Sequence, residues 1–241
     1  MKERIYTIPI NEAFDKNCEC AICSFEKQQQ QKIIEYTLGA SMMEPDFRII
    51  TNELGFCEFH TSMLIKQENK LSYALVLKTH MDDLIEQFEN MALQLEDQPK
   101  KSFFSKQTDI GDEILKGVNK RNNSCAVCEK LSSVMESFID NIIYIYEREN
   151  EFQTKFENSK GFCIRHFEQL LNSAKKQLND KKYKEFSKNL FNLQISNLKR
   201  VRDDVDWFTK KFDYRYKNED WKNSRDSVPR ASTKISGYYE E

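Results

Sequence analysis

Hydrophobic residues recur along the chain at intervals of three and four positions, the spacing that places side chains on one face of an α-helix. The clearest stretch runs from Leu131 to Tyr146, and its large apolar side chains predict a helix with one buried face. No segment shows the alternation of Val, Ile or Thr with polar residues that is typical of a strand. With six glycines and four prolines in 241 residues, few positions interrupt a helix. The sequence therefore predicts an all-α protein.

Two further amphipathic patterns predict long helices near the ends of the two halves of the chain. Residues 77–95 step by alternating fours and threes, the seam along which antiparallel helices pack. A matching pattern spans residues 186–212, with Asn197 as its one polar interruption. Between them lies a polar region, within which residues 110–118 form one expected short helix. The predicted organisation is a first helical repeat at 1–96, a linker at 97–124, a second helical repeat at 125–217 and an extended tail at 218–241.

Cysteine and histidine residues form a pattern that occurs twice. Each copy begins with Cys-x-x-Cys and continues, after a gap that differs by one residue between the copies, with Gly-Phe-Cys-x-x-His. Six of the seven cysteines and two of the three histidines belong to this pattern, which indicates an internal duplication into two homologous halves. The first copy comprises Cys20, Cys23, Cys57 and His60, and the second comprises Cys125, Cys128, Cys163 and His166.

This spacing is typical of a structural metal site. Two ligands separated by two residues can face one ion from a tight turn or one helical turn, and two such pairs complete a tetrahedron. Thiolate and imidazole are ligands that zinc prefers. We therefore expect two structural zinc ions, one in each half, each joining the start of one helix to the start of the next. Gly55 and Gly161 precede the second pairs and permit the positive φ of a sharp turn.

Other uses of these residues remain open. Three cysteines and one histidine also hold iron–sulfur clusters, and spacing alone leaves that alternative standing. A thioredoxin-type redox pair requires a strand–helix–strand context that the pattern lacks. Cys18 has no counterpart in the second copy and is interpreted as a spare thiol, and His80 as a packing histidine.

The overall charge of the chain does not favour one kind of binding partner over another. The chain has 37 basic and 39 acidic residues, a formal net charge of −2. The stretch from Lys175 to Lys211 holds eleven Lys or Arg against five Asp or Glu, which suits either a phosphate-contacting face or the solvated side of a helix, and we favour the latter. No apolar run approaches the roughly 18 residues of a membrane span, and the amino terminus has no signal-like segment. We expect a cytoplasmic protein with reduced thiols and no membrane contact.

The motifs favour binding over catalysis. A metal with four protein ligands has no open position for water or substrate, and no Ser-His-Asp or phosphate-loop motif is present. The sequence does not decide whether the protein is an enzyme, and it favours a protein that is not. The predicted function is a zinc-stabilised helical binding or adaptor module for a protein partner. The alternative is an iron–sulfur or redox-sensitive metal protein that acts in electron transfer or regulation.

Short motifs distributed over nearly the whole chain also resemble those of a known protein family. They are Ile8-Pro9-Ile10, Cys20 to Cys23, Met43 to Arg48, Thr51-Asn52, Gly55 to Cys57, Gly161 to Cys163, Trp207-Phe208 and Phe212 to Arg215. This set resembles an uncharacterised family from anaerobic Gram-positive bacteria, a domain of unknown function whose members are sometimes labelled substrate-binding proteins of ABC transporters. The resemblance supports the ligand pairs and implies no established activity. The transporter label implies a leader peptide and a two-lobed α/β fold, and the sequence pattern predicts neither.

Overall fold

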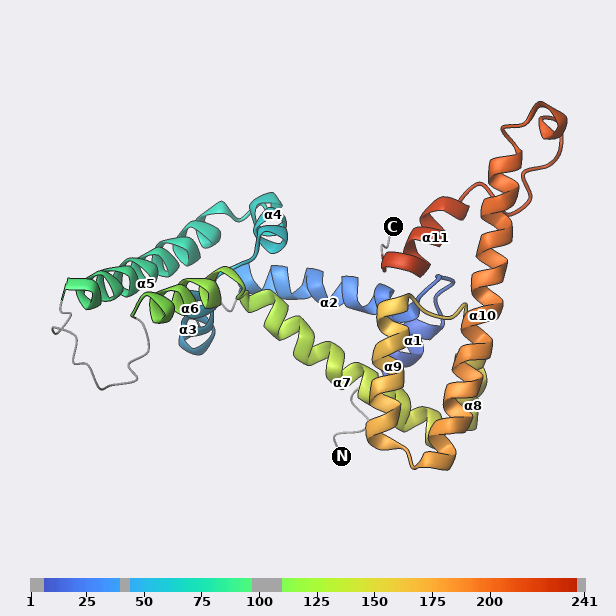
Figure 1. Ribbon diagram of the computed structural model, residues 1–241, viewed down its shortest axis with the longest axis horizontal. Coiled ribbons are helices and arrows are strands. Elements are labelled where there is room, and N and C mark those ends of the chain that lie inside the picture. The colour runs from blue at the N-terminus through green and yellow to red at the C-terminus, as the bar shows by residue number, and fades with distance from the viewer. Residues whose placement is uncertain (1–6, 40–43, 97–109, 238–241) are drawn as a thin grey trace, which may run out of the picture. The chain divides into compact units, whose positions relative to one another are not determined.

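The computed structural model describes residues 7–39, 44–96 and 110–237 (Figure 1). Over these residues the chain is all-helical, with eleven α-helices, one short 3-10 helix and no strand. The predicted fold class is thereby confirmed. Residues 97–109 of the predicted linker and 238–241 of the predicted tail lie outside the described residues.

Two compact units make up the fold. Unit 1 comprises Met1–Gln29 and Val134–Glu241, and unit 2 comprises Gln30–Ser133. The chain passes from one unit to the other within α2 (Ala21–Leu38) and again within α7 (Ala126–Arg148). The units therefore differ from the predicted succession of repeat, linker and repeat, because each of these two helices begins in one unit and ends in the other.

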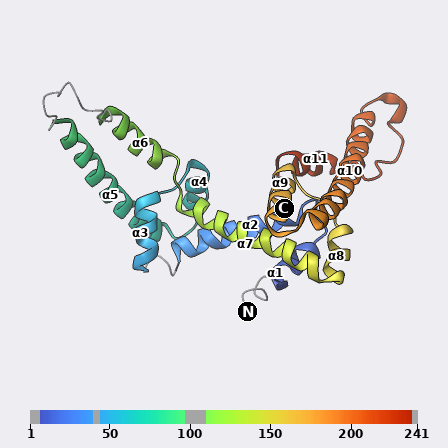
Figure 2. The same ribbon diagram turned by 60° about the horizontal axis from the view of Figure 1, so that its bottom comes forward.

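Unit 1 contains the start of α2, the end of α7 and all described helices that follow α7. Figure 2 shows α9, α10 and α11 together, and these three helices contact one another pairwise. The remaining helices of unit 1 are α1 (Thr7–Phe14), α8 (Asn150–Glu157), α9 (Ile164–Gln177), α10 (Asp180–Lys210), η3 (Tyr214–Tyr216) and α11 (Ser227–Ser236).

Aromatic side chains form the core of unit 1. Phe156 is buried and contacts Phe14 of α1, Phe162 of the loop before α9, and Phe186 of α10, with ring centroids 5.2 to 5.9 Å apart. Such ring pairs contribute packing energy beyond the burial of their area. Helices that are distant in sequence are therefore held by one continuous aromatic cluster.

Unit 2 has a smaller aliphatic core. Its helices are α3 (Pro45–Leu54), α4 (Glu58–Lys66), α5 (Lys70–Glu96) and α6 (Ile110–Asn122), together with the end of α2 and the start of α7. Arg121 of α6 donates to Gln87 Oε1 of α5 and to the carbonyl of Asn52 in α3, and pairs with Asp83 of α5. The buried core residues are Ile33, Ile34, Leu38, Leu64, Tyr73, Cys125 and Val127.

The predicted amphipathic helices are present as α5, α7 and α10, and the predicted short helix is α6. In α7 the apolar face is buried, as predicted, with Phe138 and Ile142 fully enclosed. The seam of α5 is different. Met81 and Phe88 are 57 % and 52 % exposed, so a large part of that apolar face is open to solvent.

The C-terminal tail was predicted to be extended, and this is wrong for Ser227–Ser236, which form α11. Polar side chains hold this helix against the rest of unit 1: Lys234 donates to the carbonyl of Glu19, and Arg230 pairs with Asp204. Because a search for apolar periodicity does not register polar contacts, the sequence pattern did not reveal this helix. Gly237 ends the helix in a left-handed conformation (φ 74°).

Within the three described stretches, no helix has both the length and the apolar composition needed to cross a lipid bilayer.

Candidate metal sites

All four ligand pairs occupy the same local position at the start of a helix. In each pair the first residue directly precedes the helix and the second is its third residue, as in Cys57 and His60 of α4 and Cys163 and His166 of α9. The Cys-x-x-Cys pairs begin α2 and α7 in the same way. A helix N-terminus presents free N–H groups and a partial positive charge, both of which favour thiolate. His166 N–H lies 3.5 Å from Cys163 Sγ.

The turns before α4 and α9 depend on glycine, as predicted. Gly55 and Gly161 have φ values of +59° and +77°, a conformation that other residues adopt only with strain. Gly55 also leaves no room for a Cβ, which would lie 2.6 Å from His80 Nε2. His80 Nδ1 lies 2.8 Å from the carbonyl oxygen of Asn52 and outside both ligand groups, so His80 is a packing residue.

The eight predicted ligands form two groups of four. Site 1 lies in unit 1, where the Cys-x-x-Cys of α2 meets the Cys-x-x-His of α9, and site 2 lies in unit 2, where the pair of α4 meets the pair of α7. Within each group all donor atoms lie within 4.8 Å of one another. Site 1 is Cys20, Cys23, Cys163 and His166, and site 2 is Cys57, His60, Cys125 and Cys128.

This grouping corrects the prediction that each sequence half holds its own ion. Cys20 and Cys23 share a site with Cys163 and His166, and the first-half ligands Cys57 and His60 face the second Cys-x-x-Cys. Helix length gives the reason. At about 1.5 Å per residue, the 18 residues of α2 extend far from Cys20 before the chain turns towards Cys57. The two pairs of each repeat therefore belong to different units.

Both histidines direct Nδ1 towards the sulfur atoms. In site 1, His166 Nδ1 lies 3.3 Å from Cys23 Sγ and from Cys163 Sγ and 3.5 Å from Cys20 Sγ. His60 Nδ1 lies 3.3 Å from each of the three sulfurs of site 2. Cys23 Sγ and Cys163 Sγ are 3.6 Å apart, and Cys57 Sγ and Cys128 Sγ are 3.8 Å apart. Each set of four donor atoms thus lies close enough together to hold one metal ion.

The outer nitrogen of each histidine has a polar neighbour of its own. His166 Nε2 lies 3.5 Å from Glu26 Oε2, and Arg165 holds the same carboxylate in a two-pronged ion pair. His60 Nε2 lies 3.2 Å from the side-chain amide of Gln30. A hydrogen-bonded neighbour such as Gln30 orients a ligating imidazole, whereas His166 Nε2 is buried without a hydrogen-bond partner among the described residues and lies only within ion-pair distance of Glu26. The sequence pattern did not single out Glu26 or Gln30, since neither belongs to a recognisable motif.

The two sites differ in burial. The four ligands of site 1 are at most 2 % exposed, whereas in site 2 Cys128 is exposed and Cys57 is half-buried. Burial raises the pKa of the Cys20 thiol to about 12, and partial desolvation together with the neighbouring Cys125 raises the pKa of Cys128 to about 12. Burial lowers the pKa of His60. A bound divalent cation would supply the positive charge that holds such thiols as thiolates, with the imidazole neutral.

The other candidate residues lie outside the two groups. Cys18 is half-buried, and all seven cysteines are free thiols. In the basic stretch from Lys175 to Lys211, several cations already have acidic partners: Lys182 pairs with Glu147, and Arg200 pairs with Glu19. Further pairs join Lys176 to Glu136, Arg202 to Asp203 and Lys210 to Asp206.

The fold and the donor sets define a class of protein: one whose described residues are all-helical and include two groups of three cysteines and one histidine that could each hold a metal ion. The chain belongs to the family of unknown function DUF6062, whose model matches residues 1–241. No curated protein and no solved structure matches it. The family assignment confirms the part of the resemblance that concerns a family of unknown function over the whole chain, and it adds no activity.

Proposed function

We propose that this protein is a zinc-stabilised helical binding or adaptor protein, in which each ion clamps two helix starts that are remote in sequence. The meeting of two ligand pairs at each site, with four donors close together, carries this proposal. The loss of either ion would separate those helix starts and loosen the unit that holds them.

The donor separations support a single ion over a cluster. Tetrahedral zinc places two sulfurs about 3.7 Å apart and a sulfur and a nitrogen about 3.5 Å apart, from its bond lengths to each. The separations here are 3.6 and 3.8 Å between sulfurs and 3.3 to 3.5 Å between sulfur and nitrogen. An iron–sulfur cluster distributes its ligands over several irons and spreads them further apart. Four protein donors also fill the coordination of zinc, which favours a structural role over a hydrolytic one.

The binding surface that we propose is the open apolar stripe of α5 in unit 2. Met81, Ile85, Phe88 and Leu95 are 52 to 57 % exposed and, with Ala92, step by fours and threes, the pattern of a helix that packs on another helix. Residues 79–96 contain five Asp or Glu and no Lys or Arg; Asp82 and Asp83 pair with Lys78 and Arg121, and the other three are Glu. The matching partner is therefore a protein helix with an apolar face and basic flanks.

A first experiment tests the metal. Elemental analysis and an absorbance spectrum of protein purified without oxygen should give about two zinc ions per chain and no visible band. Removal of zinc with a chelator should then lower the helical circular dichroism signal. Iron with a brown chromophore would overturn the zinc assignment and favour the electron-transfer alternative.

A second experiment tests the surface. The intact protein should bind a synthetic amphipathic helix of leucine and lysine, and not its leucine–glutamate counterpart. Ile85→Asp and Phe88→Asp should abolish this binding, while Phe212→Asp, at a 74 % exposed position of unit 1, should leave it unchanged. Equal binding by all three variants would contradict the proposed surface. Because many cations of the basic stretch are already paired, nucleic acid is not part of the proposal.

The exposure of Cys128 supports a second candidate function, a redox response confined to site 2. Hydrogen peroxide would oxidise the Cys57 and Cys128 thiolates by one electron each, and their sulfurs would form a disulfide. The peroxide would take up these two electrons and two protons and become two water molecules. The ion would then leave site 2. Peroxide should then release one zinc per chain, and release of both or neither would contradict this candidate. Both candidates require reduced thiols at rest, so we place the protein in the cytoplasm.

A further inference from the structure

Helix α10 presents an exposed apolar and basic face that the proposals above do not use. Phe191 and Ile195, one turn apart, are each 47 % exposed, although the Phe191 ring packs edge-on against Phe167 of α9. Ile164, one turn before Phe167 on α9, is 50 % exposed and extends the apolar surface. Three exposed lysines lie on the same side of α10 and have no ion-pair partner among the described residues: Lys184, Lys188 and Lys199. We call these apolar residues and lysines the α10 face.

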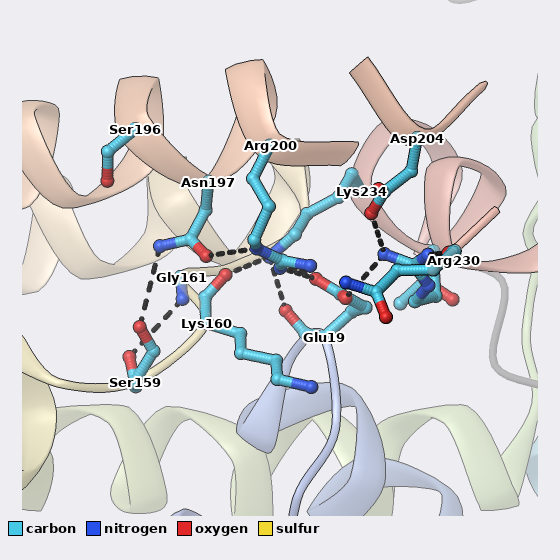
Figure 3. A network of polar contacts seen from close by, with 12 residues as sticks. Glu19, Ser159, Lys160, Gly161, Ser196, Asn197, Arg200, Asp204, Arg230 and Lys234 are labelled. Atoms are coloured by element: carbon cyan, nitrogen blue, oxygen red, sulfur yellow. Dashed lines mark hydrogen bonds and ion pairs between the residues drawn. The ribbon is translucent and has the colours of Figure 1, made fainter. Parts of the chain in front are cut away.

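The opposite side of α10 makes contacts within unit 1. Figure 3 shows Arg200 and Asp204 pointing from α10 towards the loop of Glu19 and towards α11. Arg200 pairs with Glu19 at 2.6 Å. Asp204 pairs with Arg230 of α11 at 2.8 Å. At about 100° of turn per residue, Arg200 and Asp204 lie roughly opposite Ile195, so the α10 face takes no part in this network.

The open stripe of α5 carries the opposite charge. Glu86 and Glu89 stand beside the stripe, are exposed, and have no ion-pair partner among the residues that the structure describes. The two nearby aspartates already pair with Lys78 and Arg121. The two glutamates therefore supply free negative charge next to an apolar surface, as the lysines of the α10 face supply free positive charge.

The two faces also match in length and in handedness. Each extends over about four helical turns, or about 20 Å. Glu89 follows Ile85 by four positions, and so each of the two is displaced from the other by about 40° around α5. Lys199 follows Ile195 by four positions on α10, with the same displacement in the same sense. When two such helices face each other antiparallel, both charges lie on one side of the contact and can pair while the apolar residues meet.

We propose that the partner of the α5 stripe is a second copy of this chain, whose α10 face receives the stripe in an antiparallel helix contact. The inference rests on the proposed function, because it names the partner of the surface proposed there. Each copy has both faces, so one copy can offer its stripe and its α10 face at the same time. The contact is small and partly ionic, so it forms with rising protein concentration and weakens with salt.

The test measures the mass of the full-length, zinc-loaded protein by sedimentation velocity over a range of concentrations. The mean mass should exceed that of one chain and rise with concentration, and roughly 0.5 M salt should lower it. Ile195→Asp should lower the association constant at least about tenfold, because a charge enters the apolar contact. It should keep the binding of the leucine–lysine helix, which uses α5 alone. Phe88→Asp should abolish both.

A charge exchange tests the pairing of the two faces. One variant combines Glu86→Lys with Glu89→Lys on the stripe, and the other combines Lys188→Glu with Lys199→Glu on the α10 face. Each variant alone should associate at least about tenfold more weakly, since like charges face each other. An equimolar mixture should associate again, because the reversed stripe of one variant meets the reversed α10 face of the other.

The matched control combines Glu12→Lys with Glu151→Lys, which reverses two exposed carboxylates of α1 and α8 and should leave the association unchanged. A single chain at every concentration, or a mixture of the two exchange variants that stays monomeric, would overturn the inference. If such a monomer still binds the leucine–lysine helix, the stripe serves another protein and the proposed function stands. Loss of that binding in the wild-type protein would instead contradict the proposed surface itself.

Discussion

Sites 1 and 2 have the same donors in the same local motif, yet their surroundings differ. Each joins a Cys-x-x-Cys and a Cys-x-x-His at two helix starts. Site 1 is enclosed by unit 1, with α11 over its sulfurs, while Cys128 of site 2 is exposed. The comparison teaches that the motif sets the geometry of the donors, and that the packing around the motif sets how easily solvent reaches them.

The largest expected difference is in the loss of one ligand. Cys163→Ser should lose one of the two zinc ions, because no solvent reaches the buried site to supply another ligand. The free energy of unfolding should fall by a large share of the about 10 kcal/mol that zinc binding contributes. Cys128→Ser should keep two ions in excess zinc, since water can take the open fourth position. Metal analysis after gel filtration measures the number of bound ions, and urea unfolding measures the stability of each variant. Equal damage by the two variants would remove the contrast between the sites.

A smaller effect tests whether the two cores act separately. Phe156→Ala should cost about 3–5 kcal/mol and Leu64→Ala about 2–5 kcal/mol, because each leaves a cavity at a fully buried position. Phe156→Ala should speed zinc loss from site 1 alone, and Leu64→Ala from site 2 alone. Zinc-transfer kinetics report both rates, and a variant that speeds both phases alike would show coupled cores.

The glycines before α4 and α9 give a further comparison. Gly161→Ala and Gly55→Ala should each cost about 1–2 kcal/mol, the strain of a left-handed conformation. Gly55→Ala should cost more, because its Cβ meets the ring of His80 at 2.6 Å, whereas the Cβ at Gly161 meets Gln194 Oε1 at 3.1 Å. When His80→Ala is combined with Gly55→Ala, the free energy of unfolding in urea should rise by that extra cost. No recovery would mean that the clash with His80 is not its source.

The smallest effect concerns the wild-type protein. Zinc transfer to a chelator should have two phases that differ by about tenfold, equal to about 1.4 kcal/mol of barrier. The fast phase should belong to site 2, where a chelator reaches the exposed Cys128 first. Labelling of Cys128 by iodoacetamide should follow the fast phase. A fast phase that is absent from Cys163→Ser and kept in Cys128→Ser would reverse the assignment.

The sequence by itself determined the all-α class, the amphipathic helices α5, α7 and α10, the eight candidate ligands and the glycine turns. These features are local: apolar spacing sets the faces of α7 and α10, and the x-x spacing places both members of a pair within the first turn of one helix. A single stretch of chain contains all the information that such features need. The internal duplication is likewise a statement about sequence and remains a prediction.

Only the tertiary structure decided which pairs share a site and that the tail folds. The grouping depends on where the long helices α2 and α7 end. Cys20 and Cys57 thereby belong to different units, and Cys20 shares its site with Cys163. The docking of α11 depends on Lys234 and Arg230 meeting Glu19, more than two hundred residues away along the chain. Polar contacts between remote residues leave no periodic pattern, because each needs only one side chain at the right place in space.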